Sequence, residues 1–138
     1  MEKISLNEID DFAKKLAKEL KGGEILALVG DLGSGKTTFT KALGKALNIK
    51  ANIISPTFIL MNVFPAKLPG QKGKPIYLYH LDLYRTKNFR EVKALGITEV
   101  WGEKDTVTVI EWADKIKKYL PKEARFIYFK TSKERSVP

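Results

Sequence analysis

The stretch GDLGSGKTTFT, Gly30 to Thr40, limits what this chain can fold into more than any other part of its sequence. It follows ILALV (Ile25 to Val29), a short, continuous apolar run bounded by glycines, which predicts a strand buried on both faces. Residues from about Lys36 to Leu47 predict a helix that ends near Asn48. The chain therefore places a glycine-rich turn between a buried strand and a helix.

This turn matches the pattern G-x-x-x-x-G-K-[ST] from Gly30 to Thr37. Its glycines allow successive backbone amides to point into one concavity, and the N-terminus of the following helix adds partial positive charge. Lys36 is placed to reach the β and γ phosphates of a nucleotide, and Thr37 offers a hydroxyl to Mg²⁺. The predicted nucleotide-binding residues of this loop are Asp31, Leu32, Gly33, Ser34, Gly35, Lys36, Thr37 and Thr38.

An enzyme of this kind needs an acidic residue at the end of a neighbouring strand to complete the magnesium site. Glu111 ends the apolar run TVTVIE, which is typical of a central parallel strand, whereas Asp82 ends the more polar, edge-ward run YLYHLD. We therefore predict Glu111 as the magnesium partner. Asp82 either orients a water molecule or caps the turn at DLYR, and the sequence leaves both readings open. We interpret His80 as a hydrogen-bonded structural residue rather than a base.

The remaining pattern alternates strands and helices. Ser5 and Glu8 have the spacing of a capping box, so a helix should begin there and end at Gly22. The other predicted elements are a hairpin of strands 58–64 and 75–83, a helix 88–96, a strand 106–111, a helix 113–120 and a strand 124–130. This predicts an α/β layered domain resembling a P-loop NTPase, with a mostly parallel central sheet plus an antiparallel hairpin.

Composition excludes several classes of protein. A length of 138 residues favours one domain spanning residues 1–138, and no apolar run approaches the roughly 20 residues of a membrane span. The polar, acidic N-terminus is unlike a secretory signal, so we expect a cytoplasmic protein. The absence of cysteine and the single histidine exclude disulfides and thiolate metal sites and disfavour zinc. A net charge of +9, concentrated toward residues 113–138, favours polyanionic partners without identifying one.

Five motifs in order carry a resemblance to one family. They are GDLGSGKTTFTKAL, SPTF at Ser55 to Phe58, YHLDLYR at Tyr79 to Arg85, GITEVW at Gly96 to Trp101 and VIEW at Val109 to Trp112. Together they resemble the TsaE family of small bacterial ATPases, from the first helix to the last strand. The resemblance implies an ATP-hydrolysing accessory protein in the threonylcarbamoyladenosine (t6A) modification of tRNA, which assists a pair of proteins, TsaB and TsaD. tRNA would be met only through that pair.

The resemblance also implies roles for single residues. Lys36 would bind phosphate, while Thr37 and Glu111 would hold Mg²⁺ beside ATP. Thr57 would belong to a switch-like loop near the γ phosphate, and Asp82 would serve hydrolysis. Trp112 would pack near the nucleotide, although the sequence alone predicts a core aromatic residue there.

Three other functions use some of the same features. A small-molecule P-loop kinase has the same loop but usually adds an arginine-rich lid, and no such insertion is seen between Glu91 and Thr106. A nucleotide-dependent switch would use Thr57, but the chain lacks the N-K-x-D motif that reads guanine. An RNA-binding module would use the basic C-terminal region. Arg85 and Arg90 could contact either a partner or phosphate, and the connection 65–75 predicts a long hairpin loop with a basic tip.

Overall fold

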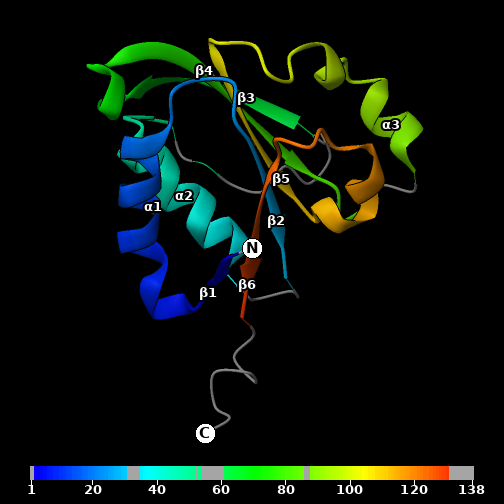
Figure 1. Ribbon diagram of the computed structural model, residues 1–138, viewed down its shortest axis with the longest axis horizontal. Helices are drawn as coiled ribbons and strands as arrows, with labels where there is room; N and C mark the ends of the chain where they lie inside the picture. The colour runs from blue at the N-terminus through cyan, green and yellow to red at the C-terminus, as the bar shows by residue number, and fades with distance from the viewer. Residues whose placement is uncertain (1, 31–34, 52, 54–60, 86–87, 131–138) are drawn as a thin grey trace, which may run out of the picture.

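A six-stranded sheet in the order β1-β6-β2-β5-β4-β3 forms the centre of the structure. The computed structural model describes residues 2–30, 35–51, 53, 61–85 and 88–130 (Figure 1). Its strands are β1 Glu2–Ile4, β2 Ile25–Val29, β3 Met61–Leu68, β4 Lys74–Asp82, β5 Thr106–Glu111 and β6 Arg125–Phe129. Its helices are α1 Ile9–Glu19, α2 Lys36–Ala46 and α3 Phe89–Lys93, with 3-10 segments at Leu6–Glu8, Pro69–Gln71, Ile97–Glu99 and Ala113–Tyr119.

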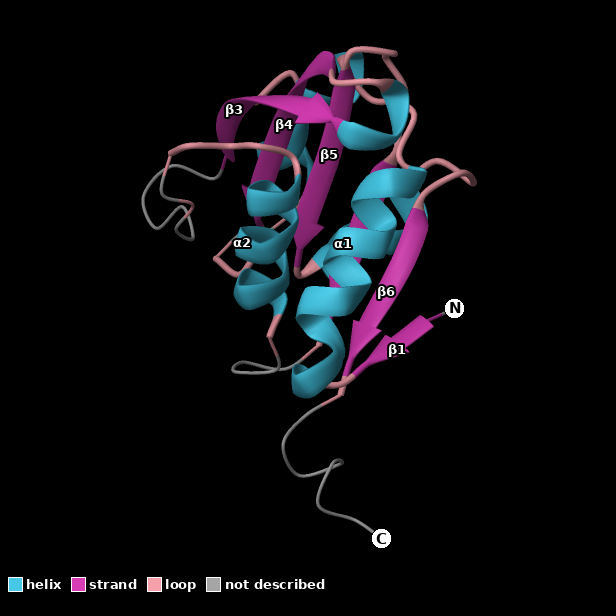
Figure 2. Cartoon of the chain, turned by 90° about the vertical axis from the view of Figure 1, so that its left-hand side faces the viewer, coloured by secondary structure: helices cyan, strands magenta, loops and turns pink. Residues whose placement is uncertain are grey.

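Helices cover both faces of this sheet. Helices α1 and α2 lie side by side on one face, while α3 and the later 3-10 segments lie on the other (Figures 1 and 2). The pairs β1/β6, β6/β2, β2/β5 and β5/β4 are parallel, and the β3/β4 pair is antiparallel. The predicted fold class, a layered α/β protein with a mostly parallel sheet plus a hairpin, is confirmed.

The sheet separates two hydrophobic clusters. Ala13, Leu16, Phe39 and Leu43 of the first two helices pack with Leu78 and other residues on one face. Ile110 and Leu81 belong to the cluster on the opposite face, together with Val92, Ile97 and Ile116 of the later segments. Because side chains alternate between the faces of a strand, β5 contributes to both clusters, and all six of its residues are buried. This position, covered on both faces, explains why the segment TVTVIE is mainly apolar.

The predicted capping box at Ser5 is present, but it opens the 3-10 segment Leu6–Glu8, and α1 follows from Ile9. A strand that the sequence pattern did not reveal precedes this segment. The Ser5 amide donates to Glu8 Oε1 at 3.2 Å, which is the returning bond of a capping box. Strand β1 has three residues, of which Ile4 pairs with Phe129 of β6. Three residues are too few to show a period of two, so only the partner strand defines β1.

The hairpin prediction was correct in pairing and wrong in length. Strand β3 runs through Pro65 to Leu68, and the connection is only the short turn at Pro69–Gln71 followed by Lys72 and Gly73. Pro65 is tolerated because β3 is the edge strand, where a missing amide leaves no ladder bond unmade. The tip is not a free loop, since a Cβ added to Gly70 would lie 1.9 Å from the Lys18 carbonyl oxygen of α1.

The remaining short helices follow the prediction with one difference. Helix α3 begins after Asn88, whose side chain accepts from the Glu91 amide at 3.2 Å, and Gly96 follows it at φ +76°. The segment Ala113–Tyr119 is 3-10 rather than α-helical and is interrupted at Ile116, whose φ is −125°. Ile116 is buried in the core, so packing overrides the weak propensity of a short helix. No helix in the described residues is long and apolar enough to cross a membrane.

Candidate functional site

The candidate site lies where the carboxyl ends of parallel strands meet the start of α2. Strand β2 ends at Val29, and β4 and β5 end in register at Asp82 and Glu111. In sheets of this type ligands bind beyond the carboxyl ends of the strands. Gly35 precedes α2 at φ +109°, a left-handed conformation that favours glycine. The fold therefore brings Gly30 and Gly35, the described ends of the glycine-rich stretch, and both predicted acids to one edge of the sheet.

Lys36 is a buried cation at the first position of α2. Its side chain is only 5% exposed, and its Nζ donates to the Gly30 carbonyl. The same Nζ lies 4.0 Å from the centroid of the Trp112 ring, within the range of a cation–π contact. The lysine is thus held at the N-terminal end of α2, where the helix dipole also favours an anion. A phosphate oxygen could replace the carbonyl as its acceptor.

Thr37 and Glu111 meet although 74 residues separate them in sequence. Thr37 Oγ1 donates to Glu111 Oε1 at 3.0 Å. Glu111 is 2% exposed, in agreement with the prediction that it ends a central strand. The two predicted magnesium ligands are therefore neighbours, which sequence alone could only suggest.

His80 provides the second partner of Glu111. Its Nε2 lies 2.6 Å from Glu111 Oε2, and the histidine is fully buried. His80 pairs with Val109 in register, so it lies on the same face of the sheet as Glu111, two residues further along β5. The interpretation of His80 as a hydrogen-bonded residue is confirmed, but the sequence did not identify its partner.

Asp82 lies beside Glu111 in a partly buried position. Burial raises the pKa of Asp82, and the nearby Glu111 charge raises it further, against the bond from the Tyr84 amide and the positive charge of Lys36. Asp82 Oδ1 accepts the Tyr84 amide at 3.0 Å, so the turn cap that the sequence suggested is present. A hydrolytic role remains a prediction, and the cap does not exclude it.

Trp112 forms the wall of the site next to Lys36. Its backbone is left-handed at φ +60°, and its ring centroid lies 5.1 Å from that of Tyr84. Lys115 extends this group, since its Nζ donates to the Tyr84 carbonyl and lies 5.7 Å from the Tyr84 ring. The sequence placed Tyr84 inside YHLDLYR without assigning it a contact, and no pattern indicated Lys115.

Several predicted residues either lie on the surface or fall outside the described residues. Thr38 is exposed on the first turn of α2, and Arg85 and Arg90 are exposed on the surface. The predicted loop residues Asp31, Leu32, Gly33 and Ser34, and the switch residue Thr57, lie outside the described residues. Their assigned roles remain predictions.

The donor set suits Mg²⁺ better than a softer metal. A hydroxyl and a carboxylate are hard oxygen ligands, and Mg²⁺ is usually held by one or two such groups together with phosphate oxygens and water. Among the described residues no group of three or more His, Asp and Glu side chains could hold a metal by itself. The bonded pair of Thr37 and Glu111 therefore fits an ion that arrives with a nucleotide.

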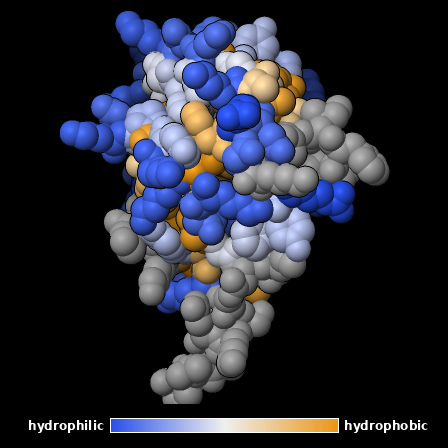
Figure 3. Space-filling model, turned by 90° about the vertical axis from the view of Figure 1, so that its right-hand side faces the viewer, coloured by the Kyte–Doolittle hydropathy of each residue, from blue (hydrophilic) through white to orange (hydrophobic). Residues whose placement is uncertain are grey.

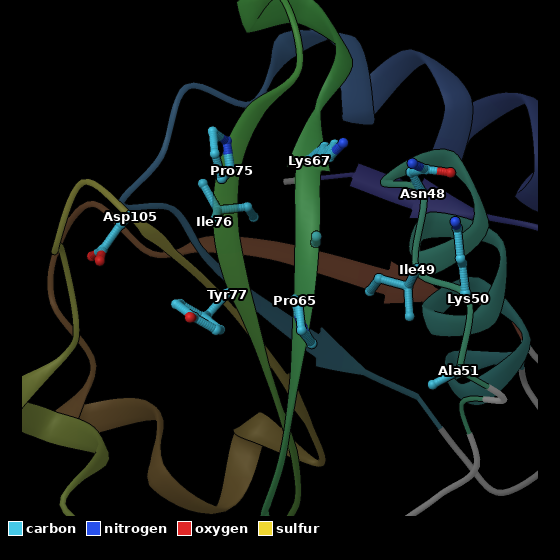
Figure 4. A pocket seen from close by; sticks show the side chains of 11 residues that line it. Asn48, Ile49, Lys50, Ala51, Pro65, Lys67, Pro75, Ile76, Tyr77 and Asp105 are labelled. Carbon is cyan, nitrogen blue, oxygen red and sulfur yellow. The ribbon is translucent and has the colours of Figure 1, made fainter.

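A hollow on the surface lies away from Lys36, Thr37 and Glu111. It has a volume of about 650 Å³ and is formed by residues 48–51 after α2, by β3 and β4, and by Asp105 (Figure 4). None of the predicted site residues lines it. The candidate site around Lys36 and Glu111 is therefore separate from this hollow and is defined by the contacts described above.

The face that carries α3 is mainly hydrophilic, with apolar surface visible between polar groups (Figure 3).

The layered sheet, the left-handed Gly35 before α2 and the acid at the end of β5 define an α/β protein of the P-loop NTPase-like type. A family model described as threonylcarbamoyl adenosine biosynthesis protein TsaE matches residues 4–137, and the chain belongs to this family. The family consists of proteins of tRNA threonylcarbamoyladenosine biosynthesis.

Individual relatives agree with this assignment. The tRNA threonylcarbamoyladenosine biosynthesis protein TsaE of Synechocystis is 40% identical over 114 residues, which cover 80% of this chain and 68% of that protein. The protein of the same name from Bacillus subtilis is 37% identical over 128 residues, covering 92% and 74%. A crystal structure of YdiB from Bacillus subtilis is similar with a TM-score of 0.63 and 32% identity, covering 91% of this chain and 71% of that one.

Proposed function

We propose that this chain is a Mg²⁺-dependent ATPase that acts in the t6A modification of tRNA as an accessory of a TsaB–TsaD heterodimer, in the cytoplasm. tRNA would be reached only through that complex. The observation that carries the proposal is the convergence of Lys36, Thr37 and Glu111 at the carboxyl edge of the sheet. Family membership supports the t6A pathway.

In this proposal the residues bind and orient the triphosphate. Lys36 would exchange the Gly30 carbonyl for phosphate oxygens, and the amides of the glycine turn are assigned to the phosphate chain. Thr37 and Glu111 would hold Mg²⁺ in place of their mutual hydrogen bond. Trp112, which contacts Lys36, packs near the nucleotide.

Hydrolysis needs a positioned water molecule and stabilisation of the charge that develops on the phosphate. Bound Mg²⁺ supplies part of this stabilisation by drawing charge from the phosphate oxygens. Lys36 supplies a second positive charge from a buried position, where its effect is larger than in water. Asp82 accepts a hydrogen bond from the attacking water, and Thr57 is assigned to the γ phosphate.

The test measures ATP hydrolysis by the isolated chain and again with TsaB and TsaD added. Wild type and the variants Lys36→Ala and Glu111→Ala are compared. We expect weak activity alone, strong stimulation by the partners, and a loss of about 100-fold or more in each variant, as for other single groups that stabilise a transition state. Binding of Mg·ATP by calorimetry shows whether the losses arise in affinity or turnover.

Two exposed residues offer matched controls. Lys41→Ala removes a lysine from the surface of α2, and Glu103→Ala removes a surface carboxylate before β5. Both should retain wild-type hydrolysis. Undiminished hydrolysis in Lys36→Ala and Glu111→Ala, or an equal loss in the controls, would remove the site assignment.

The same preparation decides between the alternatives. A small-molecule kinase would form a phosphorylated product when nucleosides or small acids are offered with ATP, and we expect none. A guanine-specific switch would bind GTP more tightly than ATP, and we expect the reverse. Tight, salt-sensitive binding of tRNA without partners would instead support an RNA-binding module.

A further inference from the structure

The carboxylate of Glu111 is divided between two partners on different elements. Oε1 accepts the Thr37 hydroxyl at the start of α2, at 3.0 Å. Oε2 faces His80 Nε2 from the neighbouring strand β4, at 2.6 Å. Since one oxygen is engaged from the neighbouring strand, the other is directed toward Thr37 at the start of α2. The orientation of the carboxylate therefore depends on His80 as well as on the Glu111 rotamer.

We propose that His80 is a positioning residue for the magnesium site: it holds Glu111 Oε2 so that Oε1 is presented to the metal beside Thr37. This inference rests on the proposed function, because it requires Glu111 to ligate Mg²⁺ with bound ATP. An ionised carboxylate only accepts hydrogen bonds, so we assign a proton to His80 Nε2, which donates to Glu111 Oε2. His80 then touches neither nucleotide nor metal and acts through Glu111 alone.

Stability does not explain why histidine occupies this place. His80 is fully buried, and within the described residues its Nδ1 has no hydrogen-bond partner. A buried polar atom left without a partner costs about 1–3 kcal/mol. A buried polar pair is often no more stabilising than apolar side chains of similar volume.

Positioning does explain the arrangement. Groups that hydrogen-bond to metal ligands fix the orientation of those ligands, and their loss typically lowers metal affinity or activity about 10–100-fold. Without the bond to His80, the Glu111 carboxylate can rotate about its last side-chain torsion, which is broad for a carboxylate. The metal would then have to supply the ordering that His80 now provides. The expected defect is in the Mg²⁺ requirement rather than in ATP contacts.

Two conservative substitutions distinguish the ring nitrogens. His80→Gln places an amide nitrogen near the position of Nε2, whereas the shorter His80→Asn places one near Nδ1, which does not face Glu111. His80→Leu removes both. Thr108→Val is the control, because Thr108 is also fully buried on β5 with an unpartnered polar atom in the described structure, yet its side chain lies on the opposite face of the strand from that of Glu111.

The experiment titrates Mg²⁺ at fixed ATP and measures both hydrolysis with TsaB–TsaD and ATP binding by calorimetry, with chelator-treated samples for metal-free binding. We expect the half-saturating Mg²⁺ concentration to rise about 10–100-fold in His80→Asn and His80→Leu. In His80→Gln and Thr108→Val the half-saturating Mg²⁺ concentration should stay within about threefold of wild type, which is below the roughly 10–100-fold range expected for loss of a positioning group. Metal-free ATP binding should not change in any variant.

Different failures have different meanings. If wild type shows no Mg²⁺-dependent binding or hydrolysis of ATP, the proposed function fails and this inference with it. If wild type depends on Mg²⁺ but all His80 variants share its requirement, only the positioning role is overturned. Equal shifts in His80→Gln and His80→Asn that follow their losses in thermal stability would indicate a structural role instead. Should His80→Leu fail to fold, the Gln and Asn pair decides the question.

Discussion

The two halves of strand β4 serve different purposes within nine residues. In the outer half, Lys74 to Leu78, exposed and buried residues alternate: Tyr77 is 50% exposed, while Leu78 is fully buried. In the inner half, Tyr79 to Asp82, both faces are covered, and His80 and Leu81 are both fully buried. The outer half follows the pattern of a sheet with one solvated face.

The difference between the two halves is that only the inner half of β4 buries a polar side chain, His80. The outer half is held by apolar contacts on one face, so its residues should affect stability and leave catalysis unchanged. The inner half places His80 and Asp82 beside Glu111; the histidine and Glu111 are buried, and Asp82 is partly buried. Buried ionisable groups are costly even when they are paired, and they cluster at functional sites, so we interpret the inner half as the functional part of β4.

The largest expected effect is on stability in the outer half. Leu78→Ala removes a fully buried side chain from the cluster beneath α1 and α2, and we expect the free energy of unfolding to fall by about 2–5 kcal/mol. Urea denaturation measures this loss. The ATP turnover of the folded fraction should stay near wild type. A large fall in turnover of the folded fraction would mean that the two halves are coupled.

Asp82→Asn should separate activity from stability in the inner half. Under the proposed role, ATP hydrolysis falls by about 100-fold, the lower end of general acid–base effects. Burial raises the pKa of Asp82, so its ionised form destabilises the fold, and wild-type stability declines as pH rises through the raised pKa. The asparagine variant keeps an oxygen acceptor for the Tyr84 amide and lacks the charge.

The stability test for Asp82→Asn uses thermal denaturation without nucleotide or metal across acidic to neutral pH. Wild type and variant should be closest below the ordinary aspartate pKa, and the variant should gain relative stability above the raised pKa. A variant that loses relative stability as pH rises would show that the ionised carboxylate is favourably paired. Unchanged hydrolysis would leave Asp82 with the turn cap alone.

The smallest effect is expected at Tyr77. This side chain is half exposed on the solvated face of the outer half, so Tyr77→Ser should change the free energy of unfolding by no more than about 0.5 kcal/mol. Hydrolysis by the isolated chain should not change. Denaturation and ATPase assays on the same sample check both. A loss comparable to that of Leu78→Ala would mean that the face of β4 bearing Tyr77 is covered in solution.

Elements with strong local sequence patterns were predicted correctly. The buried run TVTVIE became β5 with the predicted bounds, and helix α2 begins at Lys36 and ends one residue before Leu47. Continuous apolar runs, glycines and capping residues determine such elements through interactions within a few residues. Weak or conflicting signals failed: Pro65 suggested a loop, and β1 was too short to show a period. Both segments become strands because a partner strand pairs with them.

By itself the sequence determined the order of the elements, the glycine turn before α2 and the choice of Glu111 over Asp82 as the acid of the central strand. These depend on backbone preference and on hydrophobic patterning, which act locally. Only the tertiary structure decided that Glu111 would lie between Thr37 and His80, and that Lys36 would face Trp112. Those contacts depend on strand register and side-chain direction across the sheet, which are set when separate elements pack together.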